Sequence, residues 1–167
     1  MKTRRLVTLA LMTAVSLIVW VIEAQIPAPL PVPGIKLGLA NVITLAVMAL
    51  FGRRDALLVL LARVVLGSLF AGSFSSIVFS LCGGLLAWGV MAVVIGLFPR
   101  GRLWVVSVLG ALAHNAGQLL AAMAVTRTAA LVSYAPALAA AAIITGTFTG
   151  LACQGLVRAL EKHGILK

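Results

Sequence analysis

Seven polar or charged side chains are prominent in this sequence because each lies within a long apolar run or at its end. A polar group in an apolar medium must find a hydrogen-bonding partner or face a polar cavity, since leaving it unpaired is costly. Cationic, amide, imidazole and carboxylate groups gathered together could bind the anionic, carbonyl and amine groups of a small solute. The candidate substrate-binding residues are Glu23, Lys36, Asn41, Arg63, His114, Asn115 and Gln118.

Three of these residues share one face of an expected helix. His114 and Gln118 are four residues apart, and Asn115 and Gln118 are three apart, which are the spacings of neighbours on a helix surface. Arg63 follows an Arg-Arg pair by nine residues, which places it about 13 Å along its helix, near mid-membrane. This clustering favours a polar cavity open to the outside. The alternative is a structural network in which Glu23 neutralises Arg63, or carbonyl groups bond to it, while Asn115 and Gln118 tie helices together.

The stretch from Val32 to Asn41 brings a lysine and an asparagine to the start of an apolar run, directly after a proline-rich connector. Proline holds the connector in an extended shape, and Gly34 and Gly38 permit sharp turns and close approach. We expect Gln25–Lys36 to form a lid that becomes ordered when solute binds and thereby signals to partners. A stiff surface loop whose lysine marks the membrane interface is the competing interpretation.

The composition indicates a membrane protein. Of the 167 residues, 63% are hydrophobic and 10% are charged, and a soluble domain of this length could not bury so much apolar surface. The net charge of +10 comes from short clusters between apolar runs, a distribution that argues against a nucleic-acid partner. Cys82 and Cys153 lie in apolar runs without paired spacing, so we expect buried thiols and no disulfide, metal site or cofactor.

Charged residues and prolines divide the chain into six apolar segments. The first is longer than the core of a secretory signal and lacks a clear cleavage site, so we interpret it as a membrane helix. Small residues four apart, which let helices pack closely in lipid, occur in several segments. The six segments are Leu6–Ala24, Leu37–Phe51, Ala56–Phe70, Ile77–Phe98, Leu103–Val125 and Pro136–Val157, and the small pairs are Ala10 with Ala14, Ala113 with Gly117 and Gly146 with Gly150.

Charge placement decides between six crossings and fewer. If all six segments cross and the amino terminus is cytoplasmic, ten lysines and arginines lie inside, two lie outside, and Arg63 lies within the membrane. A re-entrant hairpin of the second and third segments would instead place Arg53 and Arg54 at mid-membrane, beside only Asp55. The predicted fold class is therefore all-α: a polytopic bundle of six transmembrane helices in the cell membrane. We expect one domain over residues 1–167, with both termini cytoplasmic.

Several stretches resemble the Gx transporter family, which is often labelled heptaprenyl diphosphate synthase component I. That family is similar in size and span count to the substrate-binding S components of energy-coupling factor (ECF) vitamin transporters. The resemblance implies capture of a small solute, such as a vitamin, cofactor or isoprenoid precursor, from the outside, with a transmembrane coupling protein and cytoplasmic ATPases as partners. The matching stretches are Pro33–Asn41, Ser80–Gly84, Gly110–Gln118, Tyr134–Pro136 and Thr145-Gly146.

The same resemblance implies a partner-binding face on the first helix, because Ala10 and Ala14 match the Ala-x-x-x-Ala pattern that meets the coupling protein in S components. The enzyme label is harder to reconcile with the residues, since prenyl diphosphate synthesis needs clustered aspartates to hold magnesium and Asp55 is the only aspartate. We expect no enzymatic activity from this chain. The alternative function is a non-catalytic membrane subunit associated with prenyl diphosphate or quinone synthesis, or with flavin-linked electron transfer.

Overall fold

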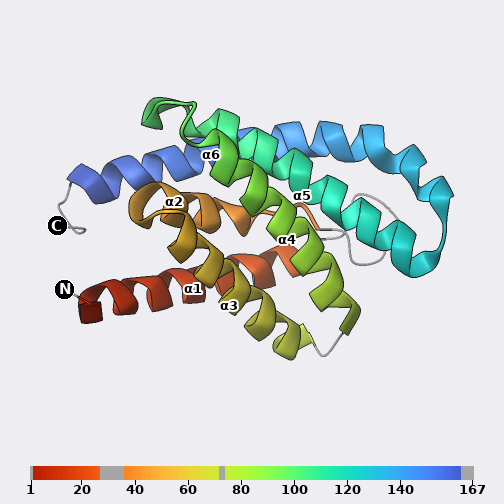
Figure 1. Cartoon of the computed structure of the whole chain (residues 1–167), viewed down its shortest axis with the longest axis horizontal. Coiled ribbons are helices and arrows are strands. Elements are labelled where there is room, and N and C mark those ends of the chain that lie inside the picture. The colour runs from red at the N-terminus through yellow and green to blue at the C-terminus, as the bar shows by residue number, and fades with distance from the viewer. Residues whose placement is uncertain (1, 27–35, 72–73, 163–167) are drawn as a thin grey trace.

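The computed structural model describes residues 2–26, 36–71 and 74–162, and these residues form α-helices joined by short turns and two 3-10 helices, with no strand among them (Figure 1). The predicted all-α fold class is thus confirmed. The α-helices are α1 (Lys2–Gln25), α2 (Asn41–Phe51), α3 (Arg53–Ala71), α4 (Phe74–Val94), α5 (Leu103–Thr126) and α6 (Ala135–Lys162), and the 3-10 helices are η1 (Arg100–Arg102) and η2 (Ala129–Tyr134).

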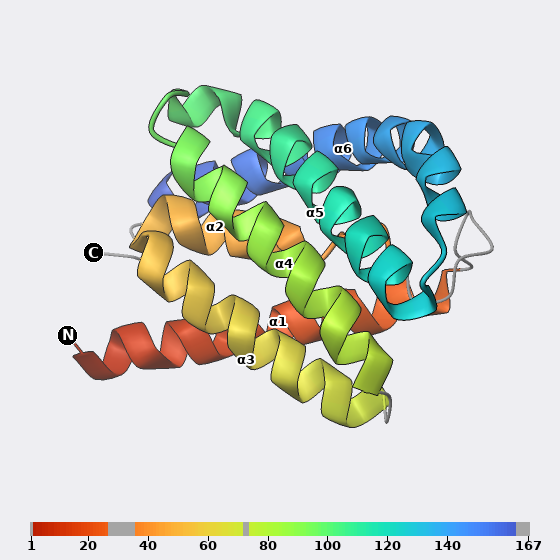
Figure 2. The same ribbon diagram turned by 45° about the vertical axis from the view of Figure 1, so that its right-hand side comes forward.

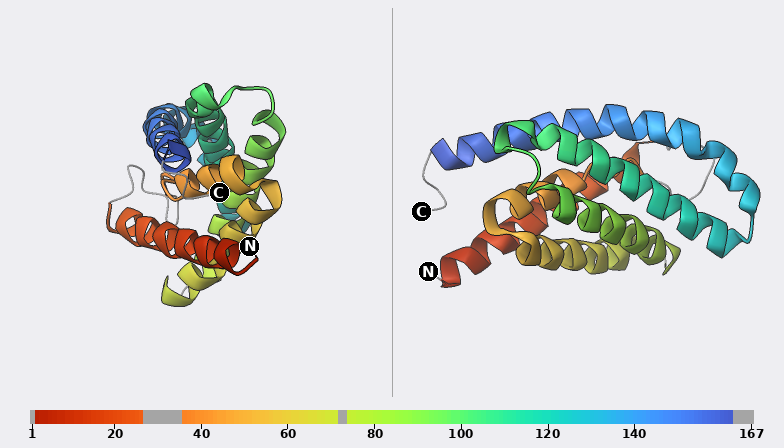
Figure 3. Two further views of the ribbon diagram at one scale, coloured as in Figure 1. Left: turned by 90° about the vertical axis from the view of Figure 1, so that its left-hand side faces the viewer. Right: turned by 45° about the horizontal axis from the view of Figure 1, so that its top comes forward.

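Helix α2 lies at the centre of the bundle and contacts each of the other five α-helices. Around it, α1 packs on α3, α3 on α4, α4 on α5 and α5 on α6, as the end-on view shows (Figure 3, left). The sequence explains this place, because α2 is apolar on nearly every side and most of its residues are buried. A helix that is hydrophobic all round is stable only when it is enclosed.

The helices alternate in direction along the chain (Figures 1 and 2). Helices α1, α3 and α5 run from one end of the bundle to the other, and α2, α4 and α6 return. As a result, α1 begins and α6 ends at the same end, which we call the terminal end. The opposite end, where α1 ends and α6 begins, is called the far end.

Four helical stretches are long and apolar enough to cross a membrane, namely Thr3–Gln25, Ile77–Val94, Arg100–Thr126 and Ala129–Lys162. Large apolar side chains on the outside of the bundle agree with a lipid environment; Phe70, for example, is 78% exposed. The expected second and third spans, which correspond to α2 and α3, are not among these four stretches. Helix α2 has only 11 residues, and α3 carries charged residues in its first turn and Arg63 further along.

The second helix begins later than the sequence predicted. The expected start was Leu37, whereas α2 starts at Asn41, because Gly38 adopts a φ of 78° that interrupts a right-handed helix. The residues Lys36–Ala40, called the inward segment below, are therefore non-helical. Non-helical backbone at membrane depth must be enclosed by protein that satisfies its polar groups, and the bonds that do so form part of the site described below.

Small residues set the close packing of α6 on α5. A methyl group added at Gly150 would lie 2.4 Å from the Cα of Trp104, and one added at Gly146 would lie 2.7 Å from the Cα of Val108. The predicted packing role of this glycine pair is confirmed. The predicted burial of both cysteines is only half right: Cys153 is buried, but Cys82 is exposed on the outside of α4.

Polar contacts fix the helices at the terminal end. Arg5 of α1 forms an ion pair with Asp55 in the first turn of α3, with 2.6 Å between Nη2 and Oδ2. The indole Nε1 of Trp88 donates a hydrogen bond to the backbone carbonyl of Arg53 over 3.0 Å. Together these contacts tie the start of α3 to α1 and α4.

Candidate functional site

The predicted site residues come together where the inward segment enters the bundle. We call Glu23, Lys36, Asn41, Arg63, His114 and Gln118 the polar cluster; five of them are buried and Lys36 is partly exposed. They come from α1, the inward segment, α2, α3 and α5. Because α2 begins only at Asn41, the backbone of the inward segment lies beside these side chains.

Two residues of the cluster hold the backbone of the inward segment. The Glu23 carboxylate accepts a hydrogen bond from the Gly38 backbone N–H, with 2.5 Å between the two atoms. The Gln118 side-chain oxygen accepts one from the Lys36 backbone N–H over 3.0 Å. The sequence predicted both side chains as solute ligands, and in this structure they bind the chain's own backbone.

The side chain of Lys36 lies over the indole of Trp20, with its Nζ 3.8 Å from the ring centroid, a cation–π contact. The Lys36 ammonium is close enough to Glu23 and Arg63 for both charges to act on it, the first attractively and the second repulsively. Trp20 also packs on Gly67 of α3, where an added methyl group would lie 3.4 Å from the indole. Sequence reasoning missed Trp20, although it lies three residues before Glu23 and thus on the same face of α1.

The imidazole of His114 lies between two glycines. A methyl group added at Gly38 would lie 2.8 Å from His114 Cδ2, and one added at Gly83 of α4 would lie 2.9 Å from His114 Cε1 and 2.8 Å from Gln118 Cγ. Side chains other than hydrogen at these two positions would therefore displace the histidine or the glutamine. Gly83 was not among the predicted site residues, although it belongs to a stretch that carried the family resemblance.

Arg63 is buried, and no carboxylate of the described residues forms an ion pair with it. It is 4% exposed, and its Nε and Nη2 atoms have no hydrogen-bond partner within residues 2–26, 36–71 and 74–162. The charge of Arg63 acts on Glu23, but the ion pairs within 4.0 Å in the described part of the chain are those of Arg5 with Asp55 and Arg100 with Glu161. The structural alternative is therefore seen in part. The Glu23 charge acts on Arg63 without a direct ion pair, and Asn115 and Gln118 bond to other segments as that alternative expected.

Other buried polar atoms are also unpaired within the part of the chain that the structure describes. Asn41 Nδ2 and Thr44 Oγ1 lack a partner there, as does Ser16 Oγ on α1. Asn41 and Thr44 are three residues apart and share a face of α2. Ser16 lies one turn before Trp20 on the buried stripe of α1. Unpaired donors and acceptors at several points of one interior are unusual in a finished core, because each is costly unless something else satisfies it.

Asn115 has a different setting. Its Nδ2 donates a hydrogen bond to the backbone carbonyl of Leu138 over 2.9 Å, which ties α5 to α6, while its Oδ1 has no partner among the residues described. The two partner-binding candidates, Ala10 and Ala14, are exposed on α1. The part of the expected lid from residue 27 to residue 35 lies outside the described residues.

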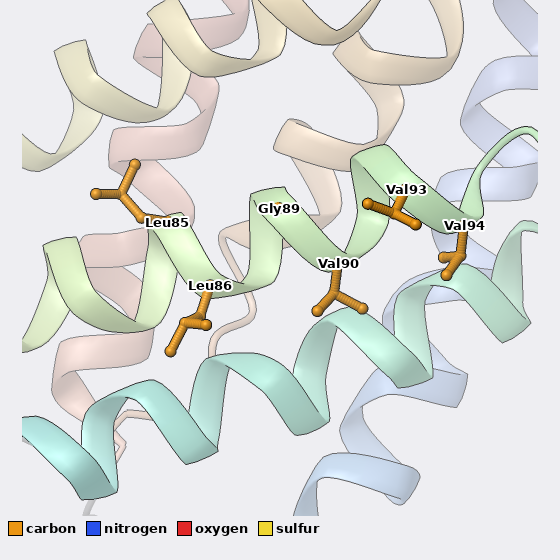
Figure 4. A pocket seen from close by; sticks show the side chains of 6 residues that line it. All are labelled: Leu85, Leu86, Gly89, Val90, Val93 and Val94. Atoms are coloured by element: carbon orange, nitrogen blue, oxygen red, sulfur yellow. The ribbon is translucent and has the colours of Figure 1, made fainter.

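A surface groove also runs along α4 and is lined by apolar residues (Figure 4). Leu86, Val90 and Val94 lie on the side of this groove toward α5. The groove has almost no polar surface, so it offers nothing that could orient a polar solute. Its walls suit contact with lipid chains.

Comparison with known protein families adds one finding to this geometry. Residues 12–156 match the family described as heptaprenyl diphosphate synthase component I. The chain belongs to this family. The match confirms the resemblance inferred from the inward segment, the Ser80–Gly84 stretch and the α5 stretch. Neither the curated proteins nor the solved structures gave a match to this chain.

Proposed function

We propose that this chain is a six-span membrane protein that captures a small solute from outside the cell and acts as the substrate-binding subunit of an ECF-type uptake system. Both termini face the cytoplasm in this arrangement. The alternating helix directions (Figure 2) support it, because α1 begins and α6 ends at one end of the bundle. The positive-inside bias then assigns the terminal end to the cytoplasm and the far end to the outside.

The short second helix is compatible with six crossings. In this arrangement the inward segment leads from the outer side toward Asn41, and α2 completes the second crossing of the membrane. Helix α3 has an apolar outer surface, while its one deep charge, Arg63, is buried inside the bundle. A charged residue within a membrane helix is tolerated when it faces the protein interior in this way.

The observation that carries the proposal is Arg63, a buried cation with two nitrogen atoms left unpaired by the described residues. A purely structural arginine would have its donors satisfied by carboxylates or carbonyls, because an unpaired buried charge is strongly destabilising. Asn41 and Thr44 add unpaired groups from the helix that contacts α3. A bound solute would satisfy these atoms. The inward segment is the element that could move to admit the solute, because it is non-helical and is held by the side-chain acceptors Glu23 and Gln118.

A partner role is supported by the outer face of α1. Ala10 and Ala14 are exposed there together with Leu6, Val7 and Leu11. Small side chains flanked by large apolar ones suit close packing of a second membrane helix. We assign this face to a transmembrane coupling protein, with cytoplasmic ATPases supplying the energy.

We further propose that the chain is not itself an enzyme, whatever its family description suggests. The sequence has three acidic residues, and each has a partner: Glu23 binds the Gly38 N–H, Asp55 binds Arg5 and Glu161 binds Arg100. These three carboxylates lie on different helices, and each binds a different partner. They therefore do not form the clustered set that holds magnesium against a diphosphate. The family description favours one alternative, a non-catalytic membrane subunit of prenyl diphosphate synthesis.

Solute capture is tested by mass spectrometry of small molecules released from the purified full chain by denaturation. We expect one compound in near-stoichiometric amount with the wild type and with Leu120→Ala, a control at an exposed position of α5, the helix that carries Gln118. Gln118→Ala removes the acceptor of the Lys36 N–H and should lose that compound while eluting as the same folded species. Equal retention by Gln118→Ala and wild type, or no compound with any of them, would contradict the proposal.

The partner role is tested by co-purification from native membranes in mild detergent. Wild type and Ala24→Leu, a control at the other end of the exposed face of α1, should recover a membrane coupling protein and ATPases. Ala14→Leu should recover less of them because the larger side chain blocks close packing. Recovery of a soluble prenyltransferase in their place would favour the alternative function.

A further inference from the structure

Resting on the proposed solute-binding function, we infer that the solute is a small organic acid carrying one negative charge, and that its oxyanion group binds the Nε–Nη2 edge of Arg63. The two unpaired atoms of Arg63 are Nε and Nη2. In a planar guanidinium, the Nε–H bond and one N–H bond of Nη2 leave the same edge in parallel. This edge matches the two oxygen atoms of a single carboxylate, and the match gives two charge-assisted hydrogen bonds.

The described part of the chain does not fill that edge. Glu23, whose charge acts on Arg63, accepts a hydrogen bond from the backbone N–H of Gly38. That bond holds the inward segment, and no ion pair within 4.0 Å joins Glu23 to Arg63 among the described residues. The structure thus holds Glu23 and Arg63 apart, leaving the arginine edge for a group that these residues do not supply.

The charges around the cluster indicate how much charge the solute carries. With the charges that these side chains ordinarily carry, Lys36 and Arg63 contribute two positive charges and Glu23 one negative charge, so this group of three has one excess positive charge. A monoanion neutralises that excess. A diphosphate, which carries several negative charges, would leave uncompensated negative charge in a buried place, and this is costly.

The neighbouring unpaired groups indicate that the acid has a polar body. Asn41 Nδ2 can donate a hydrogen bond, and Thr44 Oγ1 can donate or accept one. Both lie on one face of α2, which packs against α3. Hydroxyl or carbonyl substituents on the acid would satisfy them.

A lipid headgroup also carries an oxyanion, but the depth of Arg63 argues against it. Arg63 lies ten residues after the start of α3 at Arg53, which is about 15 Å along the helix and close to half of a bilayer core of about 30 Å. Its side chain is 4% exposed. A headgroup at the membrane surface does not reach a buried group at this depth, so the oxyanion belongs to a solute.

The test uses thermal unfolding of the purified full chain in a non-ionic detergent, after the retained compound has been washed out and its removal checked by the released-compound measurement. The probes are sodium formate, sodium acetate, sodium chloride and sodium pyrophosphate at equal ionic strength. The variants are Arg63→Lys, which keeps the charge but loses the two-pronged edge, and Arg54→Lys, the same change at an exposed position on the same helix. Formate or acetate at about ten times its dissociation constant should raise the Tm of wild type and Arg54→Lys by about 3 to 5 °C relative to chloride.

In Arg63→Lys, formate and acetate should raise the Tm no more than chloride does. Pyrophosphate should raise the Tm no more than chloride does in any variant. The inference is overturned if neither formate nor acetate raises the Tm of the wild type more than chloride does. This comparison does not depend on any variant folding correctly. It is also overturned if Arg63→Lys keeps the carboxylate effect, or if pyrophosphate stabilises more than acetate does. A stabilising effect of vesicle-forming phospholipids that abolishes the acetate effect and is itself lost in Arg63→Lys would assign the arginine edge to a lipid and overturn it as well.

The released-compound measurement separates this inference from the proposed function. If the wild type retains a neutral or cationic compound, the inferred solute class is wrong while solute capture stands. If the wild type retains nothing, solute capture itself is wrong.

Discussion

Replacing Gly83 by alanine should disrupt the polar cluster, although the change adds only a methyl group to a helix. The new methyl would lie 2.8 Å from Gln118 Cγ and 2.9 Å from His114 Cε1 and Nδ1. The imidazole cannot simply move away, because its other edge is already against Gly38. Gln118, which is 1% exposed, is held by its bond to the Lys36 N–H.

The size of the effect follows from two opposing terms. Overpacking a filled interior by a methyl group costs about 1 to 3 kcal/mol, while exchange of glycine for alanine within a helix gains about 0.5 to 1 kcal/mol. The net loss in the free energy of unfolding is then at most about 2.5 kcal/mol, and about 1 kcal/mol at the middle of both ranges. Gly89 lies on the same helix, and a methyl group there would meet nothing within 4 Å. Gly89→Ala should therefore gain about 0.5 to 1 kcal/mol, since only the helix term applies.

Equilibrium unfolding of the full chain in mixed micelles measures both variants against the wild type. We expect Gly83→Ala and Gly89→Ala to differ by about 1 to 3 kcal/mol, because the helix term is common to both and only the overpacking term remains. Adding His114→Ala to Gly83→Ala should make the pair less destabilising than the sum of the two single changes, because the crowded partner is removed. Equal stability of the two glycine variants, or strict additivity with His114→Ala, would refute the packing that we describe.

Two further predictions concern the scaffold. Gly150→Ala should destabilise the chain by about 1 to 3 kcal/mol, because the added methyl group would meet the backbone of α5. Gly155→Ala should not destabilise it, since a methyl group there would meet nothing within 4 Å. Unfolding in micelles measures both variants, and equal stability of the two would contradict the prediction. Asp55→Asn should lower the free energy of unfolding by about 0.5 to 1 kcal/mol at low salt and by little at high salt, because the partner Arg5 is largely exposed and salt screens the ion pair. A loss of stability that does not depend on salt would show that the ion pair is not the source of the effect.

Much of the fold follows from local features of the sequence. Each expected apolar segment is helical over most of its length, although α2 starts at Asn41 instead of Leu37 and α4 ends at Val94 instead of Phe98. A helix satisfies the backbone of a long apolar run within the segment itself. The packing of Gly146 and Gly150 on α5 follows from their spacing. The exposure of Cys82 could not be predicted, because α4 is apolar on all sides and its sequence does not show which face meets the bundle.

The site was predicted as a set of residues but not as an arrangement. Segment spacing and topology indicated that Glu23, Arg63 and His114 share one region. The late start of α2 depends on a glycine conformation that is fixed by bonds to Glu23 and to Gln118, which is 82 residues from Lys36. The ion pair of Arg5 with Asp55 spans 50 residues. Contacts over such separations exist only once the helices have packed, so no local pattern reports them.

The central claim is that the described residues leave Nε and Nη2 of Arg63 unpaired because a solute completes their bonding. The most direct measurement is a density map of the full chain, purified from its native membrane without added ligand, at a resolution that shows small molecules. The account predicts density that belongs to no residue of the chain, within hydrogen-bond distance of Arg63 Nε and Nη2. An Arg63 edge bonded to the chain's own carboxylate or carbonyl groups, with no other density beside it, would contradict the account.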